Sequence, residues 1–137
     1  MPTLQKSERL CSYKVIDTLF KSGKSFTVFP FRIVWKNVIL ESGFPAQVTF
    51  SVSKRNHKKA VTRNYIKRLM REAYRENKEI LYKNLNDRSI AIMIIYIDKN
   101  IPTLPVTRDK IKVIFERFKK EQNNDLQNNQ NQDIAIS

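Results

Sequence analysis

Apolar and polar residues alternate along two segments of the chain, as they do in β-strands that bury one face. In FTVFPFRIVWKNVIL (residues 26–40) the alternation places four side chains on one face: Phe29, Phe31, Ile33 and Trp35. Pro30 lacks an N–H and therefore favours the start of that strand or an edge position. A further strand around Val38 is possible. QVTFSVS (47–53) predicts a half-buried strand, and SIAIMIIYI (89–97), apolar at nearly every position, predicts a central strand covered on both faces.

Elsewhere the apolar residues recur every three to four positions, which predicts helices. A short helix is expected over residues 12–21, with Ser12 as its N-cap and Gly23 where a C-terminal cap belongs. A long helix is expected roughly from Ala60 to Leu85. A last helix should follow Thr107, its expected N-cap, and its apolar stripe is formed by Ile111, Ile114, Phe115 and Phe118.

These elements indicate a small α+β sandwich in the order α-β-β-α-β-α, or with one more strand if the region around Val38 forms one. We predict a single domain over residues 1–122. Residues 123–137 are rich in Asn and Gln and carry no core-forming pattern, so we expect a disordered tail there.

The chain is strongly basic, with 26 Lys and Arg against 13 Asp and Glu and a net charge of +13. Between Lys54 and Lys83 there are eleven basic and three acidic residues, a net charge of +8 in one segment. Such a charge predicts a polyanionic partner, nucleic acid first and an acidic membrane surface second. With one cysteine, Cys11, no internal disulfide is possible, and no signal-peptide or membrane-spanning pattern is present, so we expect a cytoplasmic protein.

On a helical projection of the long helix, the charges separate by sign. Arg63, Lys67, Arg71 and Arg75 follow one another at i+4, and Asn64, Arg68 and Lys78 share their arc of about 140°. The three glutamates occupy a different arc. An ordinary solvated helix mixes the two signs at i+4 spacing, so this separation favours binding of a phosphate backbone over a plain charged surface.

The same residues resemble a known family. RNYIKRLMREAYR (63–75) resembles the arginine-rich signature of the bacterial ribonuclease P protein subunit, and SVSKRNHKKAV (51–61) is similar to the strand and turn that precede it. RLCSYKVIDTLFKSGKS (9–25) is similar to the first helix of that family and its glycine. The resemblance covers roughly residues 9–120.

The resemblance implies an α+β sandwich of about four strands and three helices, in the order α-β-β-β-α-β-α, with a left-handed βαβ crossover that the general rule would not have chosen. It implies a subunit of an endoribonuclease that binds the catalytic ribonuclease P RNA and the 5′ leader of precursor tRNA. The RNA hydrolyses the leader with Mg²⁺, held mainly by the RNA, so the protein supplies no catalytic side chain. The protein is expected to be a monomer within the holoenzyme, with no membrane partner.

Carried over by position, the resemblance assigns contacts with the catalytic RNA to the signature helix and to the loop before it. These residues are Lys54, Arg55, Lys58, Lys59, Arg63, Asn64, Lys67, Arg68, Arg71 and Arg75. It assigns leader binding to a cleft between the first helix and the sheet, at Ile16 and Phe20, since aromatic side chains stack on unpaired bases. Ile16 stands where the family often has a second aromatic residue, and the loop around His57 looks one residue longer than in the family.

Two other interpretations stay open from the residues alone. The first is a structural RNA-binding protein of the ribosomal type with no role in processing. The second is a DNA-binding protein, which is weaker because no heptads for dimerisation are present. For Phe31 and Trp35, core packing is the first interpretation and stacking in the cleft the second. His57 has no acidic neighbour in sequence, so an RNA contact or a plain loop residue is expected rather than a catalytic base.

Overall fold

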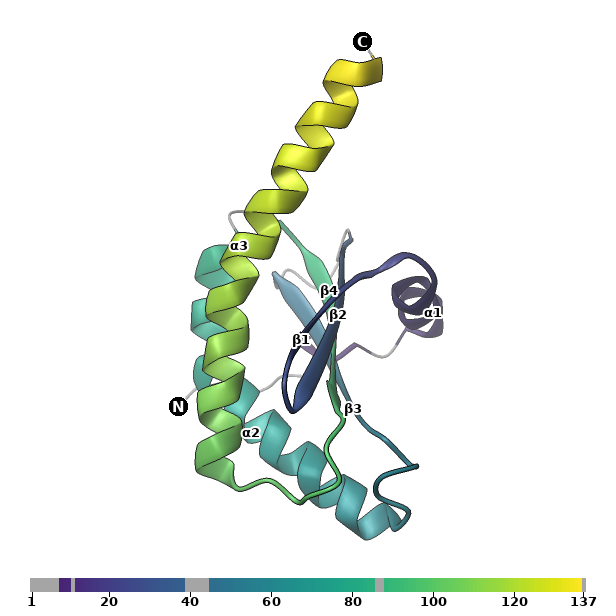
Figure 1. Ribbon diagram of the computed structural model, residues 1–137, viewed down its shortest axis with the longest axis vertical. Helices are drawn as coiled ribbons and strands as arrows, with labels where there is room; N and C mark the ends of the chain where they lie inside the picture. The colour runs from purple at the N-terminus through teal and green to yellow at the C-terminus, as the bar shows by residue number, and fades with distance from the viewer. Residues whose placement is uncertain (1–7, 11, 39–44, 86–87, 137) are drawn as a thin grey trace.

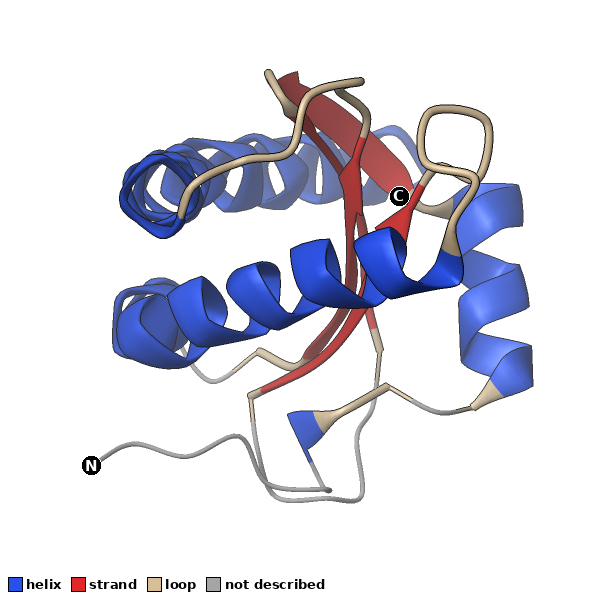
Figure 2. Ribbon diagram, turned by 90° about the horizontal axis from the view of Figure 1, so that it is seen from below, coloured by secondary structure: helices blue, strands red, loops and turns tan. Residues whose placement is uncertain are grey.

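Strand β4 (Ile90–Tyr96) lies inside a four-stranded sheet of order β1-β2-β4-β3, with helices on both faces. The computed structural model describes residues 8–10, 12–38, 45–85 and 88–136. Helix α1 (Tyr13–Ser22) covers one face, and α2 (Ala60–Asn84) and α3 (Leu104–Ile136) cover the other (Figures 1 and 2). The order of the elements is α-β-β-β-α-β-α, which confirms the α+β sandwich.

The expected strand over residues 26–40 is a hairpin in the structure. Strands β1 (Lys24–Val28) and β2 (Phe31–Asn37) pair antiparallel and are joined by a turn at Phe29 and Pro30. The extra strand is therefore β1. Val38 directly follows β2, and the rest of the possible strand around it, residues 39–44, lies outside the described residues. Phe29 is 61% exposed in the turn rather than facing the core. The alternation runs on through the turn residues, so the sequence pattern alone does not reveal the reversal of the chain.

Strand β2 also pairs antiparallel with β4, whereas β3 (Ala46–Val52) pairs parallel with β4. Parallel neighbours need a crossover, and α2 supplies it. The predicted bounds of the long helix agree with α2 to within one residue. Beside β3, a parallel bridge from Arg9 to Val48 adds a short N-terminal segment to the edge of the sheet.

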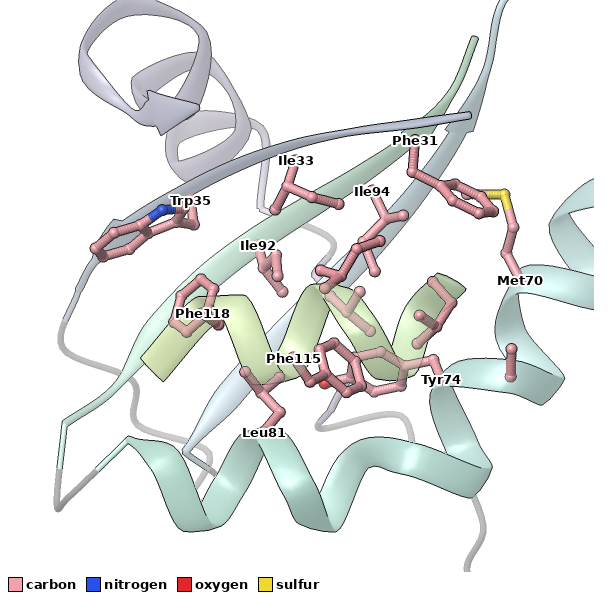
Figure 3. Close-up of a cluster of buried hydrophobic side chains, with 14 of the residues drawn as sticks. Phe31, Ile33, Trp35, Met70, Tyr74, Leu81, Ile92, Ile94, Phe115 and Phe118 are labelled. Atoms are coloured by element: carbon pink, nitrogen blue, oxygen red, sulfur yellow. The ribbon is translucent and has the colours of Figure 1, made fainter. Parts of the chain in front are cut away.

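The main core lies between the sheet and helices α2 and α3 (Figure 3). Phe31 and Trp35 are fully buried in it, which agrees with core packing as their first interpretation. The Trp35 ring meets the Phe118 ring edge-on, with 4.8 Å between their centroids. The predicted stripe of α3 is entirely buried. Each such side chain stabilises the fold by about 1.5–3 kcal/mol through removal from water.

A smaller core lies between α1 and the opposite face of the sheet. Leu19 packs there with Leu10, Val34, Ala91 and Met93. Ser12 caps the helix as predicted, since its hydroxyl oxygen accepts from the N–H of Val15. Gly23 ends α1, and a Cβ at that position would lie 2.5 Å from the Leu19 carbonyl oxygen and 2.9 Å from a methyl of Val34. The absence of a side chain at Gly23 thus lets α1 approach β2.

The last helix differs from its prediction at the N-terminal cap. Helix α3 begins at Leu104, and the N–H of Val106 donates to the Thr103 hydroxyl, so Thr103 has the capping position. Thr107 lies inside the first turn, buried, and its hydroxyl donates to the Thr103 carbonyl. The backbone of α3 continues as a helix to Ile136, through the segment predicted to be disordered, and its end projects away from the sheet (Figure 1). No Gly or Pro interrupts the sequence after Pro105.

Candidate RNA interface

The loop that connects β3 to α2, residues 53–59, is tied to the segment that follows β4. The Asn56 side-chain amide donates to the Ile97 carbonyl at 2.8 Å. His57 is 6% exposed, and its Nε2 lies 2.8 Å from the Asp98 carbonyl oxygen. A carbonyl can only accept, so this nitrogen carries the proton. His57 is therefore a structural loop residue, the second of its two expected roles.

Arg63 fixes the same loop from the helix side. One of its terminal nitrogens, Nη1, donates to the carbonyl oxygens of His57 at 3.0 Å and of Lys58 at 2.8 Å. A guanidinium can serve two backbone acceptors in this way because its donors form a planar fork. The first arginine of the signature helix thus holds the loop that carries four of the predicted RNA-binding cations.

Most of the predicted RNA-binding side chains are exposed to solvent, and they cover the loop and the first half of α2. Those that are exposed are Lys54, Arg55, Lys58, Lys59, Asn64, Arg68 and Arg71. Arg63, Lys67 and Arg75 are half-buried. Tyr74 and Leu81 are buried, although the projection places both within about 20° of Arg63, inside the cationic arc. The freely exposed cationic face of the helix is therefore narrower than the projection suggests.

Two cations of the projected arc have acidic partners. Arg75 forms an ion pair with Glu72 at 2.7 Å, so the arc is not free of anions. Lys78 turns away to the N-terminal segment, where its Nζ lies 2.9 Å from a carboxylate oxygen of Glu8. The Glu8 carboxylate, buried beside α2, also accepts from the Tyr82 hydroxyl. A helical projection of α2 could not show this because Glu8 lies 70 residues earlier.

Burial raises the pKa of the Tyr82 hydroxyl well above its ordinary value, and the charge of Glu8 adds to that shift. Burial likewise raises the pKa of Tyr96, to about 12. Both phenols therefore stay protonated at neutral pH and act as hydrogen-bond donors, Tyr82 to Glu8 and Tyr96 to the Asn100 carbonyl. These contacts stabilise the region.

A cavity of about 110 Å³ lies between the C-terminal half of α1 and the sheet. Phe20, which is 66% exposed, lines this cavity. Ile16 is half-buried and packs against the smaller core. Leader binding by either residue stays a prediction. The cavity also contains Arg32, which the strand alternation of β2 places opposite the core face but to which the sequence assigns no role.

The described residues include no group of three or more His, Cys, Asp or Glu side chains able to hold a metal ion. None of the described helices is long and apolar enough to cross a membrane. Cys11 lies outside the described residues.

The fold and this surface define a class of protein, a small basic α+β domain that presents cations from a fixed loop and the helix after it. Comparison with known proteins gives the family. The family described as Ribonuclease P matches residues 4–113. A ribonuclease P protein component of Chlorobium phaeobacteroides is 33% identical over 129 residues, which cover 85% of this chain and 88% of the relative. The chain belongs to the ribonuclease P protein family.

A second relative, the ribonuclease P protein component of Porphyromonas gingivalis, is 42% identical over 87 residues, and the match spans 64% of each chain. Two solved structures share the fold. The protein from Staphylococcus aureus has a TM-score of 0.65 at 22% identity, covering 83% of this chain and 97% of that one. The protein from Thermotoga maritima has a TM-score of 0.64 at 24% identity, covering 80% and 96%. The order of elements and the β3–α2–β4 crossover are consistent with these structures.

The contacts of Arg63 predict that it matters for folding, unlike Arg68 on the exposed face. Arg63→Ala should lower the free energy of unfolding by about 1–2 kcal/mol, because two backbone carbonyls lose their donor. Arg68→Ala is the matched control, and it should change the value by less than about 0.5 kcal/mol. Urea unfolding followed by the fluorescence of the buried Trp35 measures both. Equal effects of the two substitutions would contradict a special role for Arg63.

Proposed function

We propose that this chain is the protein subunit of ribonuclease P, the endoribonuclease whose catalytic RNA removes the 5′ leader from precursor tRNA. The observation that carries the proposal is the cationic surface formed by the fixed loop 53–59 and the first half of α2. The names of the relatives as ribonuclease P protein components support the same conclusion. The partners are then the ribonuclease P RNA and precursor tRNA, and the chain works in the cytoplasm as a monomer within the holoenzyme.

The catalytic RNA binds along the exposed cations. Arg68 and Arg71 stand on adjacent positions of the exposed face of α2, and Arg guanidinium groups form paired hydrogen bonds with phosphate oxygens. Lys54 and Arg55 extend the same surface through the loop. Since the hydrogen bonds of Asn56, His57 and Arg63 hold that loop, little backbone order has to be gained on binding, which favours affinity.

The leader of the precursor lies on the other side of the sheet, in the cleft beside α1. The exposed ring of Phe20 supports this, because a single-stranded nucleic acid gains about 1–3 kcal/mol for each base that stacks on an aromatic side chain. Hydrolysis belongs to the RNA subunit, and Mg²⁺ is held mainly there. The protein contributes by binding and orienting the two RNAs.

Reconstitution tests the proposal directly. The purified protein, a bacterial ribonuclease P RNA and a labelled precursor tRNA are mixed at low Mg²⁺ concentration, where protein-dependent release of the 5′ leader is the expected result. An omission of the protein is the control. Tight binding of the RNA without any stimulation of cleavage would reject the proposal and would indicate a structural RNA-binding protein.

Arg68→Ala should weaken binding to the ribonuclease P RNA about fivefold, which is about 1 kcal/mol. It should also make the slope of log K against log salt shallower by about 0.9, because one phosphate contact is lost. Lys112→Ala, at an exposed cation of α3 outside the surface, serves as the control for simple loss of charge. Titrations at several salt concentrations measure both quantities. An unchanged slope for Arg68→Ala would remove this residue from the interface.

Phe20→Ala should reduce the affinity of the holoenzyme for precursor tRNA about tenfold and leave its affinity for mature tRNA unchanged, because only the precursor has a leader to stack. Phe29→Ala is a suitable control, since Phe29 is a similarly exposed phenylalanine that does not line the cavity. Equilibrium binding with the two tRNAs gives the comparison. An equal loss for both tRNAs would mean that Phe20 only supports the fold.

A further inference from the structure

On the face of the sheet that α1 covers, one row of side chains crosses all four strands at a level that α1 leaves open. The register aligns Thr27 of β1, Arg32 of β2, Ile95 of β4 and Ser51 of β3 across the four strands. Thr27 and Arg32 are exposed, and Ile95 and Ser51 are half-buried. In the next row, Val34 and Met93 are buried under α1. The open row thus begins where the cover of α1 ends.

The cavity of about 110 Å³ includes two members of this row, Arg32 of β2 and Ile95 of β4. It is lined by Leu19, Phe20, Gly23, Ser25, Arg32, Val34 and Ile95. This set combines one cation, one exposed aromatic ring and an apolar floor, and none of these residues is acidic. The carboxylate nearest in sequence on α1, that of Asp17, is paired with Lys21 at 2.8 Å. The chemistry of the lining suits a ligand that is flat, partly apolar and negatively charged.

We infer that Arg32 binds a phosphate of the single-stranded RNA leader, one nucleotide of which stacks its base on Phe20 at the mouth of this cavity. The inference rests on the proposed function and adds a residue and a contact to it. A guanidinium matches the spacing of two phosphate oxygens, and the apolar surface of Ile95 and Val34 accepts the edge of a base. If the ligand were instead a carboxylate of another protein, it could pair with Arg32. The exposed ring of Phe20 would then have no flat group to stack on.

The row also indicates a path for the leader across the sheet. Ser51 lies two strands away from Arg32, about 10 Å at roughly 4.8 Å between neighbouring strands. About three stacked nucleotides, at roughly 3.4 Å each, span that distance. Beyond Ser51 the same strand leads within three residues to Lys54 of the cationic loop. An RNA strand that starts on Arg32 can therefore follow the row to the surface proposed for the catalytic RNA.

Arg32→Gln tests the assignment in the reconstituted holoenzyme. It should weaken binding of precursor tRNA about fivefold and leave mature tRNA unchanged. The salt slope for the precursor should become shallower by about 0.7, the value for one phosphate of a single strand. Arg32→Lys should keep the slope, since it keeps the charge. Lys112→Gln removes a charge from α3 and should leave both tRNAs unaffected.

A leader with one neutral methylphosphonate, placed at each position in turn, identifies the phosphate. With the natural protein, the methylphosphonate at one position should lower the affinity for precursor tRNA about fivefold. With Arg32→Gln, the same replacement should cause no further loss of affinity. Equal losses for precursor and mature tRNA, an unchanged salt slope, or additive effects at every position would overturn the assignment. If the natural protein itself shows no preference for precursor over mature tRNA, the proposed leader function fails; a preference that survives Arg32→Gln rejects Arg32 alone.

Discussion

Strand β4 carries seven apolar residues in succession, so its burial stabilises the fold only if both faces of the sheet are covered. On one face α2 and α3 meet this need with long buried stripes. In the described part of the chain, the other face is covered by α1, with Leu10 of the N-terminal segment beside it. Helix α1 runs across the strands rather than along them (Figure 2). A helix about 10 Å across leaves part of seven-residue strands, about 23 Å long, uncovered. The half-buried Ile95 marks where the cover ends, and the cleft is the consequence.

The sequence predicted those elements whose apolar period is long and uninterrupted. Strand β4 and helix α2 are of this kind, and burial enforces their pattern over their whole length. Errors arose where a contact comes from a distant part of the chain or where two local signals compete. Phe29 fits the alternation of the strand pattern, but in the structure it lies in a turn. Thr103 and Thr107 are both suitable N-cap residues for the last helix, and the structure uses Thr103. The pairing of Lys78 with Glu8 joins residues that no local pattern connects.

For the candidate site, the sequence predicts where the cations lie but not what each of them does. Its cations are visible in the sequence because charge separation along a helix needs only the helical period. What each cation does is not visible, because this depends on backbone groups of another segment. Arg63 and Arg68 look alike in the signature, yet Arg63 donates to two carbonyls of the loop and Arg68 is exposed. Arg32 carried no signal beyond its place in a strand, since the cavity beside it exists only after α1 packs.

Stacking cations along α2 costs a few tenths of a kcal/mol for each like-charged pair at i+4. The buried face of the same helix offsets this, since one side chain such as Ile66 or Met70 contributes several times as much. The helix is therefore held by its apolar face, which leaves Arg68 and Arg71 exposed to solvent for the polyanion proposed above. Because Ser51 and Lys54 belong to one strand and the loop that continues it, the cleft and the cationic surface are joined without a flexible linker. The sheet sets the spacing between them, so an RNA strand bound in the cleft as proposed would meet the cationic surface at a fixed distance.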